Sequence, residues 1–109
     1  MILLSRSEEI VLLSIWKHSG NAYGTTIRER ASEITGRPWS IGAIYAPLHR
    51  LEKKGLVRTR KGMPKPERGG RSRVFYELTR EGKEALIAIR DVNEAAWRNI
   101  PELAPKTPR

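Results

Sequence analysis

One segment constrains the fold more than any other: residues 61–72, which are basic and rich in glycine and proline. The segment holds three glycines, two prolines and several lysines and arginines. Two runs that suit β-strands flank it, at 56–60 and 73–78, the first alternating at its basic positions and the second rich in β-forming residues. Glycine and proline mark tight connections. The sequence therefore predicts a two-stranded hairpin with a cationic loop.

A first helix is expected near the N-terminus. Ser7 precedes two glutamates and an apolar run through Trp16, as at a helix start where a hydroxyl caps free amides and acidic residues suit the positive end of the dipole. The helix should end near Gly20. Its apolar residues occupy most of the circumference, so one face should meet the core and another a second chain.

Two more helices should follow before the hairpin. Apolar residues at 23, 27, 31 and 34 predict a helix that stops at Gly36. Pro38 prevents the second helix from continuing. Ser40 can then cap a third helix, which ends at Gly55 and is bent by Pro47. The buried stripe of this helix is expected to consist of Ile41, Ile44, Leu48 and Leu51.

Beyond the hairpin, Thr79 can cap a C-terminal helix with one apolar stripe. The final segment, 101–109, carries three prolines and almost no apolar residue, so we expect it to be unstructured. The expected organisation is a body at 1–79, a C-terminal dimerisation helix at 80–100 and this tail.

The charge balance favours a polyanionic partner. The 109 residues include 21 Lys and Arg against 12 Asp and Glu, a formal net charge of +9. Nucleic acid and an anionic membrane surface both fit this charge. The apolar run 10–13 is far shorter than the ~20 residues of a membrane span, and the apolar start at 1–4 is too short for a signal peptide. We therefore expect a cytoplasmic protein with no membrane role.

Composition also narrows the chemistry. The chain has no cysteine, which excludes disulfides, zinc fingers and thiol nucleophiles. Its only histidines, His18 and His49, are too far apart in sequence to make a metal site and lack the neighbours of a proton relay. We expect no cofactor, no metal and no enzymatic activity. Because the hydrophobic fraction is only 39% and the aromatic fraction 6%, a partner subunit is expected to add stability.

Three helices, a two-stranded hairpin and a further helix form the order of a winged helix-turn-helix, an α+β fold that is mostly α. In this fold the helix before the hairpin enters the major groove of DNA, and the hairpin is the wing. The same fold also serves as a protein-interaction module, and a basic domain of this size can bind RNA. These two alternatives stay open at this point, although exposed aromatics for base stacking are scarce.

The order and spacing of several strings resemble the PadR family of bacterial transcriptional regulators. They are Ala22-Tyr23-Gly24 with Ile27, the runs 39–45 and 48–57, and Gly70-Arg71 through Gly82, and together they span about four-fifths of the chain. The resemblance implies a cytoplasmic homodimer that represses genes on pseudo-palindromic operators, with C-terminal helices packed across subunits. It also implies an effector near the dimer interface in some members.

The chain departs from the family pattern at two points. Pro47 lies one position later than the proline often seen after the family's tyrosine, which affects the geometry of the third helix. The single short C-terminal helix leaves little room for the second helix of longer members. This places the chain in the minimal subclass and argues against an elaborate ligand domain.

Hydroxyl groups, helix amides and cations on the predicted reading helix and wing are the candidates for contact with double-stranded DNA. Arginine suits guanine because its fork matches two acceptors in the major groove, and arginines on a hairpin can also follow phosphates or enter the minor groove. The candidate DNA-binding residues are Thr25, Ser40, Tyr45, His49, Arg50, Lys53, Arg68, Arg71 and Arg73.

The apolar stripes of the first and last helices predict a dimer seam. Trp16 and Trp97 are its aromatic anchors, and Asn93 can fix the register as isolated polar seam residues do. Ordinary packing is favoured over a pocket for a small aromatic effector between these tryptophans. The candidate interface residues are Val11, Ile15, Trp16, Leu86, Ile89, Asn93, Ala96, Trp97 and Ile100.

Overall fold

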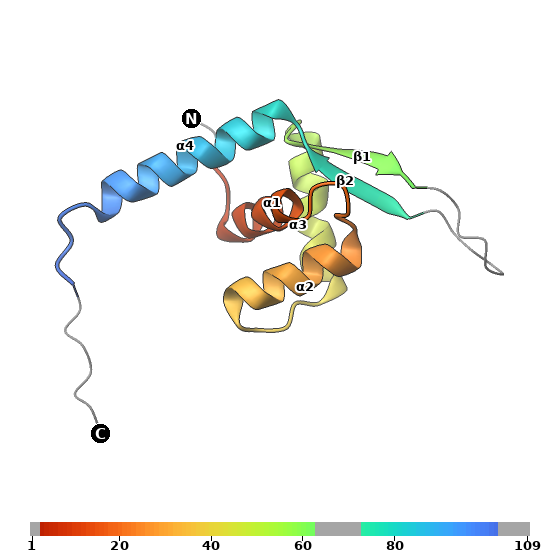
Figure 1. Cartoon of the computed structure of the whole chain (residues 1–109), viewed down its shortest axis with the longest axis horizontal. Helices are drawn as coiled ribbons and strands as arrows, with labels where there is room; N and C mark the ends of the chain where they lie inside the picture. The colour runs from red at the N-terminus through yellow and green to blue at the C-terminus, as the bar shows by residue number, and fades with distance from the viewer. Residues whose placement is uncertain (1–2, 63–72, 103–109) are drawn as a thin grey trace, which may run out of the picture.

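The computed structural model describes residues 3–62 and 73–102, and it contains the predicted elements in the predicted order (Figure 1). The described part is mostly helical with one two-stranded sheet, which confirms the expected fold class. The elements are α1 (Arg6–Lys17), α2 (Gly24–Thr35), α3 (Ile41–Lys53), β1 (Val57–Lys61), β2 (Val74–Leu78) and α4 (Arg80–Trp97).

The core lies between α1, the inward faces of α2 and α3, and the end of the sheet furthest from the hairpin loop, where Val57 pairs with Leu78. Leu12, Ile27, Ile44 and Leu51 are fully buried there. The expected stripe of α3 is wrong at its first position, because Ile41 is 48% exposed. Ile41 belongs to the first turn of α3, which lines a surface hollow instead of facing α1.

The sheet is a hairpin of β1 and β2, paired antiparallel from Val57 opposite Leu78 to Lys61 opposite Val74. The amide of Tyr76 donates to the carbonyl oxygen of Ala22 at 2.8 Å, so the connection between α1 and α2 is tied to β2. This hydrogen bond places the start of α2 beside the root of the hairpin.

Serine and threonine caps begin three of the helices. Ser40 accepts a hydrogen bond from the amide of Ala43, and Thr79 accepts one from the amide of Gly82, as predicted. The cap of α1 is Ser5 and not Ser7: the Ser5 hydroxyl accepts a hydrogen bond from the amide of Glu8, and the Glu8 carboxylate accepts one from the amide of Ser5, which together form a capping box.

α3 continues through Pro47 as one helix, as expected, and Pro47 is buried. The C-terminal helix is shorter than the expected range 80–100. α4 ends at Trp97, followed by a positive φ of 64° at Asn99, so Ile100 falls outside the helix. The second half of α4 extends away from the body (Figure 1). None of the helices described here is both long and apolar enough to cross a bilayer.

Candidate nucleic-acid interface

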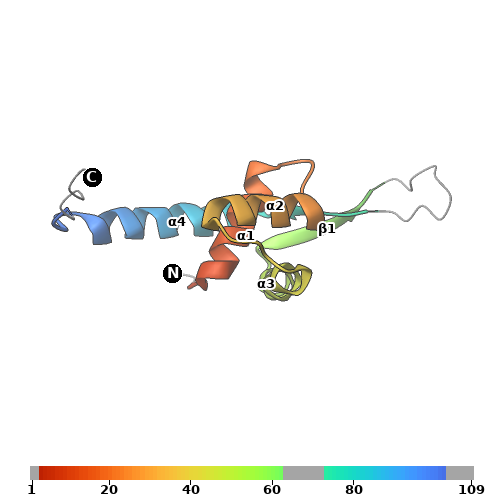
Figure 2. The same cartoon turned by 90° about the horizontal axis from the view of Figure 1, so that it is seen from below.

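The exposed side of α3 is the first part of the interface. Ile44, Leu48 and Leu51 face the core, which leaves a solvent face with Gly42 and Ala46 in its first turns and His49 and Lys53 beyond them. Figure 2 shows α3 nearly end-on, standing out from the body below α1 and α2. This is the position that a helix needs in order to enter a groove.

A surface hollow of about 330 Å³ brings together three predicted DNA-binding residues. Thr25 comes from the first turn of α2, Tyr45 from α3 and Arg73 from the residue before β2, and all three line it. The tyrosine oxygen lies against Gly24, where an added Cβ would be only 2.6 Å away. Glycine at the start of α2 therefore lets the phenol reach the helix terminus.

The electrostatics of this hollow suit an anion. Tyr23, the N-cap of α2, caps no amide with its side chain, and the positive end of the helix dipole lies here. Burial raises the pKa of Tyr76, with smaller contributions from Tyr45 and Glu52, so this phenol stays protonated. Free amides, hydroxyl groups and a guanidinium are the donors with which proteins hold phosphate.

Arg73 is held in place by an aromatic stack near the loop end of the paired strands. Its guanidinium carbon lies 4.4 Å from the ring centroid of Tyr23, and Tyr23 meets Phe75 edge-on at 5.7 Å. Arg60 covers Phe75 at 4.7 Å. A Cβ at Gly62 would overlap the Phe75 ring, so the glycine makes room for the stack. Stacking restricts both arginines and so reduces the entropy lost when they contact a ligand.

β1 adds cations that the list of predicted site residues missed. Arg58, Arg60 and Lys61 are exposed along this strand. Glu77, on the paired strand, lies 3.4 Å from Arg60 and 3.8 Å from Arg58, so this face keeps a net positive charge. The alternation of basic residues in 56–60 was the signal for a charged strand face.

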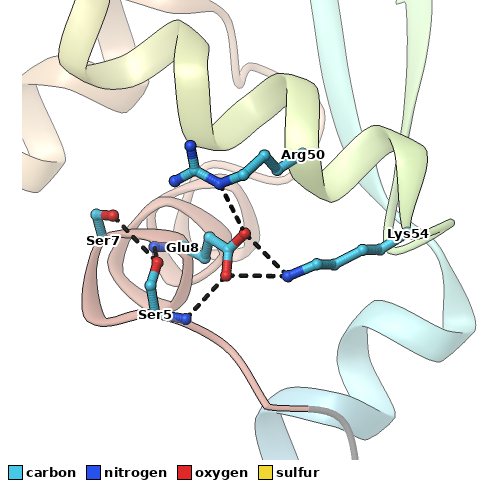
Figure 3. Close-up of polar contacts among 5 residues, drawn as sticks. All are labelled: Ser5, Ser7, Glu8, Arg50 and Lys54. Carbon is cyan, nitrogen blue, oxygen red and sulfur yellow. Dashed lines mark hydrogen bonds and ion pairs between the residues drawn. The ribbon is translucent and has the colours of Figure 1, made fainter.

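Glu8 forms a network that no sequence pattern indicated (Figure 3). Its carboxylate accepts hydrogen bonds from Arg50 Nε at 3.1 Å and from Lys54 Nζ at 3.0 Å, while only 3% of its side chain is exposed. Burial alone would raise the pKa of Glu8, but the Ser5 amide and the two cations lower it to about 2. The acid therefore stays ionised and links α1 to the C-terminal half of α3.

This low pKa predicts an acid-sensitive contribution to stability. Because the carboxyl titrates at about 2 in the folded chain and near 4.5 when unfolded, its contribution is complete above pH 5 and disappears as the pH falls toward 2. Thermal melts between pH 7 and pH 2.5 should show a steeper loss of Tm for the native chain than for Glu8→Gln. Parallel pH profiles for the two proteins would contradict this assignment.

The remaining predicted DNA contacts are placed as follows. Ser40, His49 and Lys53 are exposed on α3. Arg50 lies on the flank of α3 that faces α1 and not in the middle of its outer face. Arg68 and Arg71 lie outside the described residues. Arg37, which no pattern singled out, is exposed just before α3.

A second hollow lies away from this interface, between α1 and α4. The groove of about 540 Å³ brings together Trp16 and Trp97, the two predicted anchors, and Asn93 also lines it. Leu13, which was not predicted, contributes from α1 and is 41% exposed. The same face of α4 exposes Ile87.

Several predicted interface residues are buried within the monomer. Val11 and Ile15 are 0% and 1% exposed in its core, so they offer no surface to a second chain. Leu86 lines the groove but is 5% exposed. The apolar run 10–13 gave no signal for which of its residues face outward, because all four are apolar.

Comparison with solved structures identifies the same fold. A PadR family transcription regulator from Clostridium difficile is 26% identical, with a TM-score of 0.59 over 86% of this chain and 88% of that one. A transcriptional regulator from Clostridium thermocellum is 22% identical, with a TM-score of 0.66 over 84% and 85% of the two chains. A PadR-like regulator from Bacillus cereus is 24% identical, with a TM-score of 0.63 over 82% of each chain.

No curated protein matches the sequence. The family model described as the transcriptional regulator PadR-like family matches residues 12–88, which include α2, α3, the hairpin and the first half of α4. The match contains α3 and both strands of the hairpin, and it confirms the resemblance that the sequence motifs indicated. The chain therefore belongs to the PadR-like family of transcriptional regulators and is a DNA-binding regulator with a winged helix-turn-helix fold.

Proposed function

We propose that the protein is a cytoplasmic repressor that binds a pseudo-palindromic operator as a homodimer. The observation that carries the proposal is the convergence of Thr25, Tyr45 and Arg73, from three separate elements, on the start of α2 beside exposed α3. In a helix-turn-helix, phosphates flank the reading helix in this way and fix its register on the duplex. Two reading helices related by a twofold axis then occupy successive major grooves.

The residues divide by what they offer to DNA. Thr25, Tyr45 and Arg73 donate to phosphates on the hairpin side of α3. His49 and Lys53, on the outer face of α3, reach base edges. Ala46 on the same face is small enough to admit close approach and suits contact with a thymine methyl group. The cap of α3 at Ser40 supports the N-terminal turn, and Arg68 and Arg71 are proposed to contact DNA from the hairpin loop.

The dimer is proposed to form along the groove between α1 and α4. From residue 91 onward every described side chain is exposed, and Trp97 is 73% exposed. A helix end without tertiary contacts is marginal in water and gains stability when a second chain covers its apolar face. Trp16, Ile89, Asn93, Ala96, Trp97 and Ile100 remain in the proposed interface, joined by Leu13 and Ile87.

A small aromatic effector is a further proposal for the same place. Trp16 and Trp97 line one groove, and planar aromatic molecules stack on indole rings. A second subunit would enclose this groove from the open side. The test is a titration of the dimer with a set of planar aromatic compounds, followed by tryptophan fluorescence. A spectrum that none of these compounds changes would contradict an effector site between the two tryptophans.

Gel shifts with random-sequence duplex at low and moderate salt test DNA binding itself. Binding that weakens steeply with salt is expected, because each neutralised phosphate releases counterions. Failure to bind at either salt concentration would favour a protein-interaction module. Stronger competition by single-stranded or A-form RNA than by duplex DNA would favour an RNA-binding protein.

Arg73→Ala should weaken binding to all duplex sequences and make the slope of log K against log salt shallower by about one. The reason is the loss of one phosphate contact at the start of α2. Arg80→Ala is the matched control, since Arg80 is 86% exposed on α4 and its removal changes the net charge equally. Equal losses for both variants would show that only overall charge matters at position 73.

A further inference from the structure

None of the DNA contacts proposed above involves the ion pairs that Glu8 forms with Arg50 and Lys54. Glu8 is the only charged residue among the buried residues of the described chain. It lies on α1, while its two cationic partners are one turn apart at the end of α3, 42 and 46 residues further along. Taking an acid out of water is costly, so such a buried pairing is weak support for stability as its sole purpose.

Among the described residues, the guanidinium of Arg50 makes a hydrogen bond through its Nε alone. Its Nε donates to Glu8 Oε2, and the described residues offer its two terminal nitrogens no hydrogen bond. Figure 3 shows these nitrogens directed away from the carboxylate. About half of the side chain, 49%, is exposed. A guanidinium braced through Nε keeps its outer donors aligned for an oxygen ligand.

Arg50 also lines a surface hollow of about 740 Å³, which is separate from the hollow that Tyr45 lines beside the hairpin. Ser7, Arg37, Ser40 and Arg50 line this hollow, and no acidic side chain is among its lining residues. Tyr45, by contrast, lines the hollow on the hairpin side. The two flanks of α3 therefore both present hydroxyl groups and cations, as a helix between the two strands of a major groove requires.

We propose that Glu8 is a positioning residue for DNA binding, which fixes Arg50 so that its terminal nitrogens meet phosphates of the strand on the side of α3 away from the hairpin. This inference rests on the proposed function, since it assumes that α3 enters the groove. The phosphate contact positions α3 on the duplex and carries no sequence information of its own, so its loss should weaken binding to selected and random DNA alike.

The test measures the affinity of each variant for a duplex selected from a random pool and for random duplex. Glu8→Gln keeps a side chain that can complete the capping box, but it removes the negative charge that orients Arg50. Affinity for both duplexes should fall about tenfold, the usual effect of losing one charge-assisted hydrogen bond. Arg50→Ala should lower affinity as far, and the double variant no further.

Arg50→Lys provides a second reading that keeps a cation beside Glu8 and so preserves the fold. Lysine carries its three N–H donors on one nitrogen, which the carboxylate would hold close to α1, whereas arginine reaches Glu8 and phosphate with different nitrogens. The variant should therefore match Arg50→Ala in DNA binding while melting near the native temperature. Native DNA affinity for Arg50→Lys, or a Glu8→Gln variant that changes only Tm, would overturn the proposal. If the native protein binds no duplex, the proposed function itself fails instead.

Discussion

Gly82→Ala should destabilise the protein by about 3 kcal/mol, the upper end of what overpacking a core usually costs. Gly82 is buried in the first turn of α4, and a Cβ there would overlap the backbone carbonyl oxygen of Leu56. That oxygen already accepts the amide of Thr79, so it cannot move without breaking the joint between sheet and helix. Denaturant unfolding followed by circular dichroism measures the loss.

Gly42→Ala is the matched control, because nothing lies within 4 Å of the position that its Cβ would occupy. Gly42 is in the first turn of α3 with an ordinary helical backbone, so alanine should raise stability by about 0.5–1 kcal/mol. In a domain of this size that gain raises Tm by roughly 2–8 °C. Equal destabilisation by Gly82→Ala and Gly42→Ala would contradict the close contact between the first turn of α4 and the backbone of Leu56.

Trp97→Ala should weaken the proposed dimer by about 30-fold or more, since aromatic anchors at interfaces commonly contribute 2 kcal/mol or above. The indole is 73% exposed on α4 and gains burial only from a partner. Sedimentation at several concentrations should show a larger monomer fraction for the variant. DNA binding should weaken as well, because half-sites are then engaged one at a time.

Ile41→Ala is the control for this experiment. Ile41 is also a large exposed apolar residue, but it lies on α3 at the DNA side and not in the groove between α1 and α4. Its truncation should leave the monomer fraction unchanged. Two results would contradict the proposed dimer interface. One is a native chain that sediments as a monomer at every concentration, and the other is a Trp97→Ala chain that dimerises as well as the native one.

Local signals predicted the fold well because they act over a few residues. A hydroxyl followed by free amides located the starts of α3 at Ser40 and α4 at Thr79, and glycine ended α2 at Gly36. The same rule chose the wrong serine for α1, since Ser5 and Ser7 both precede acidic residues. The deciding fact was that Glu8 stands three residues after Ser5, which is the spacing of a capping box.

The site was predicted only in part, because its parts come from distant segments. Residue type singled out Tyr45 and Arg73, but their meeting at the start of α2 depends on how the hairpin docks. The brace between Glu8 and Arg50 spans 42 residues and has no periodicity to reveal it. α1 is apolar around most of its circumference, so its sequence did not indicate that Val11 is buried and Leu13 exposed.

The most direct test of the account is selection of bound sequences from a random duplex pool by the native protein. The enriched sequences should contain a pseudo-palindrome whose half-sites are centred about one helical turn, 10–10.5 base pairs, or a multiple of it apart. Such symmetry follows if two copies of α3 read DNA about a twofold axis. A pool that yields no common sequence, or a single asymmetric half-site, would contradict the symmetric, sequence-reading dimer.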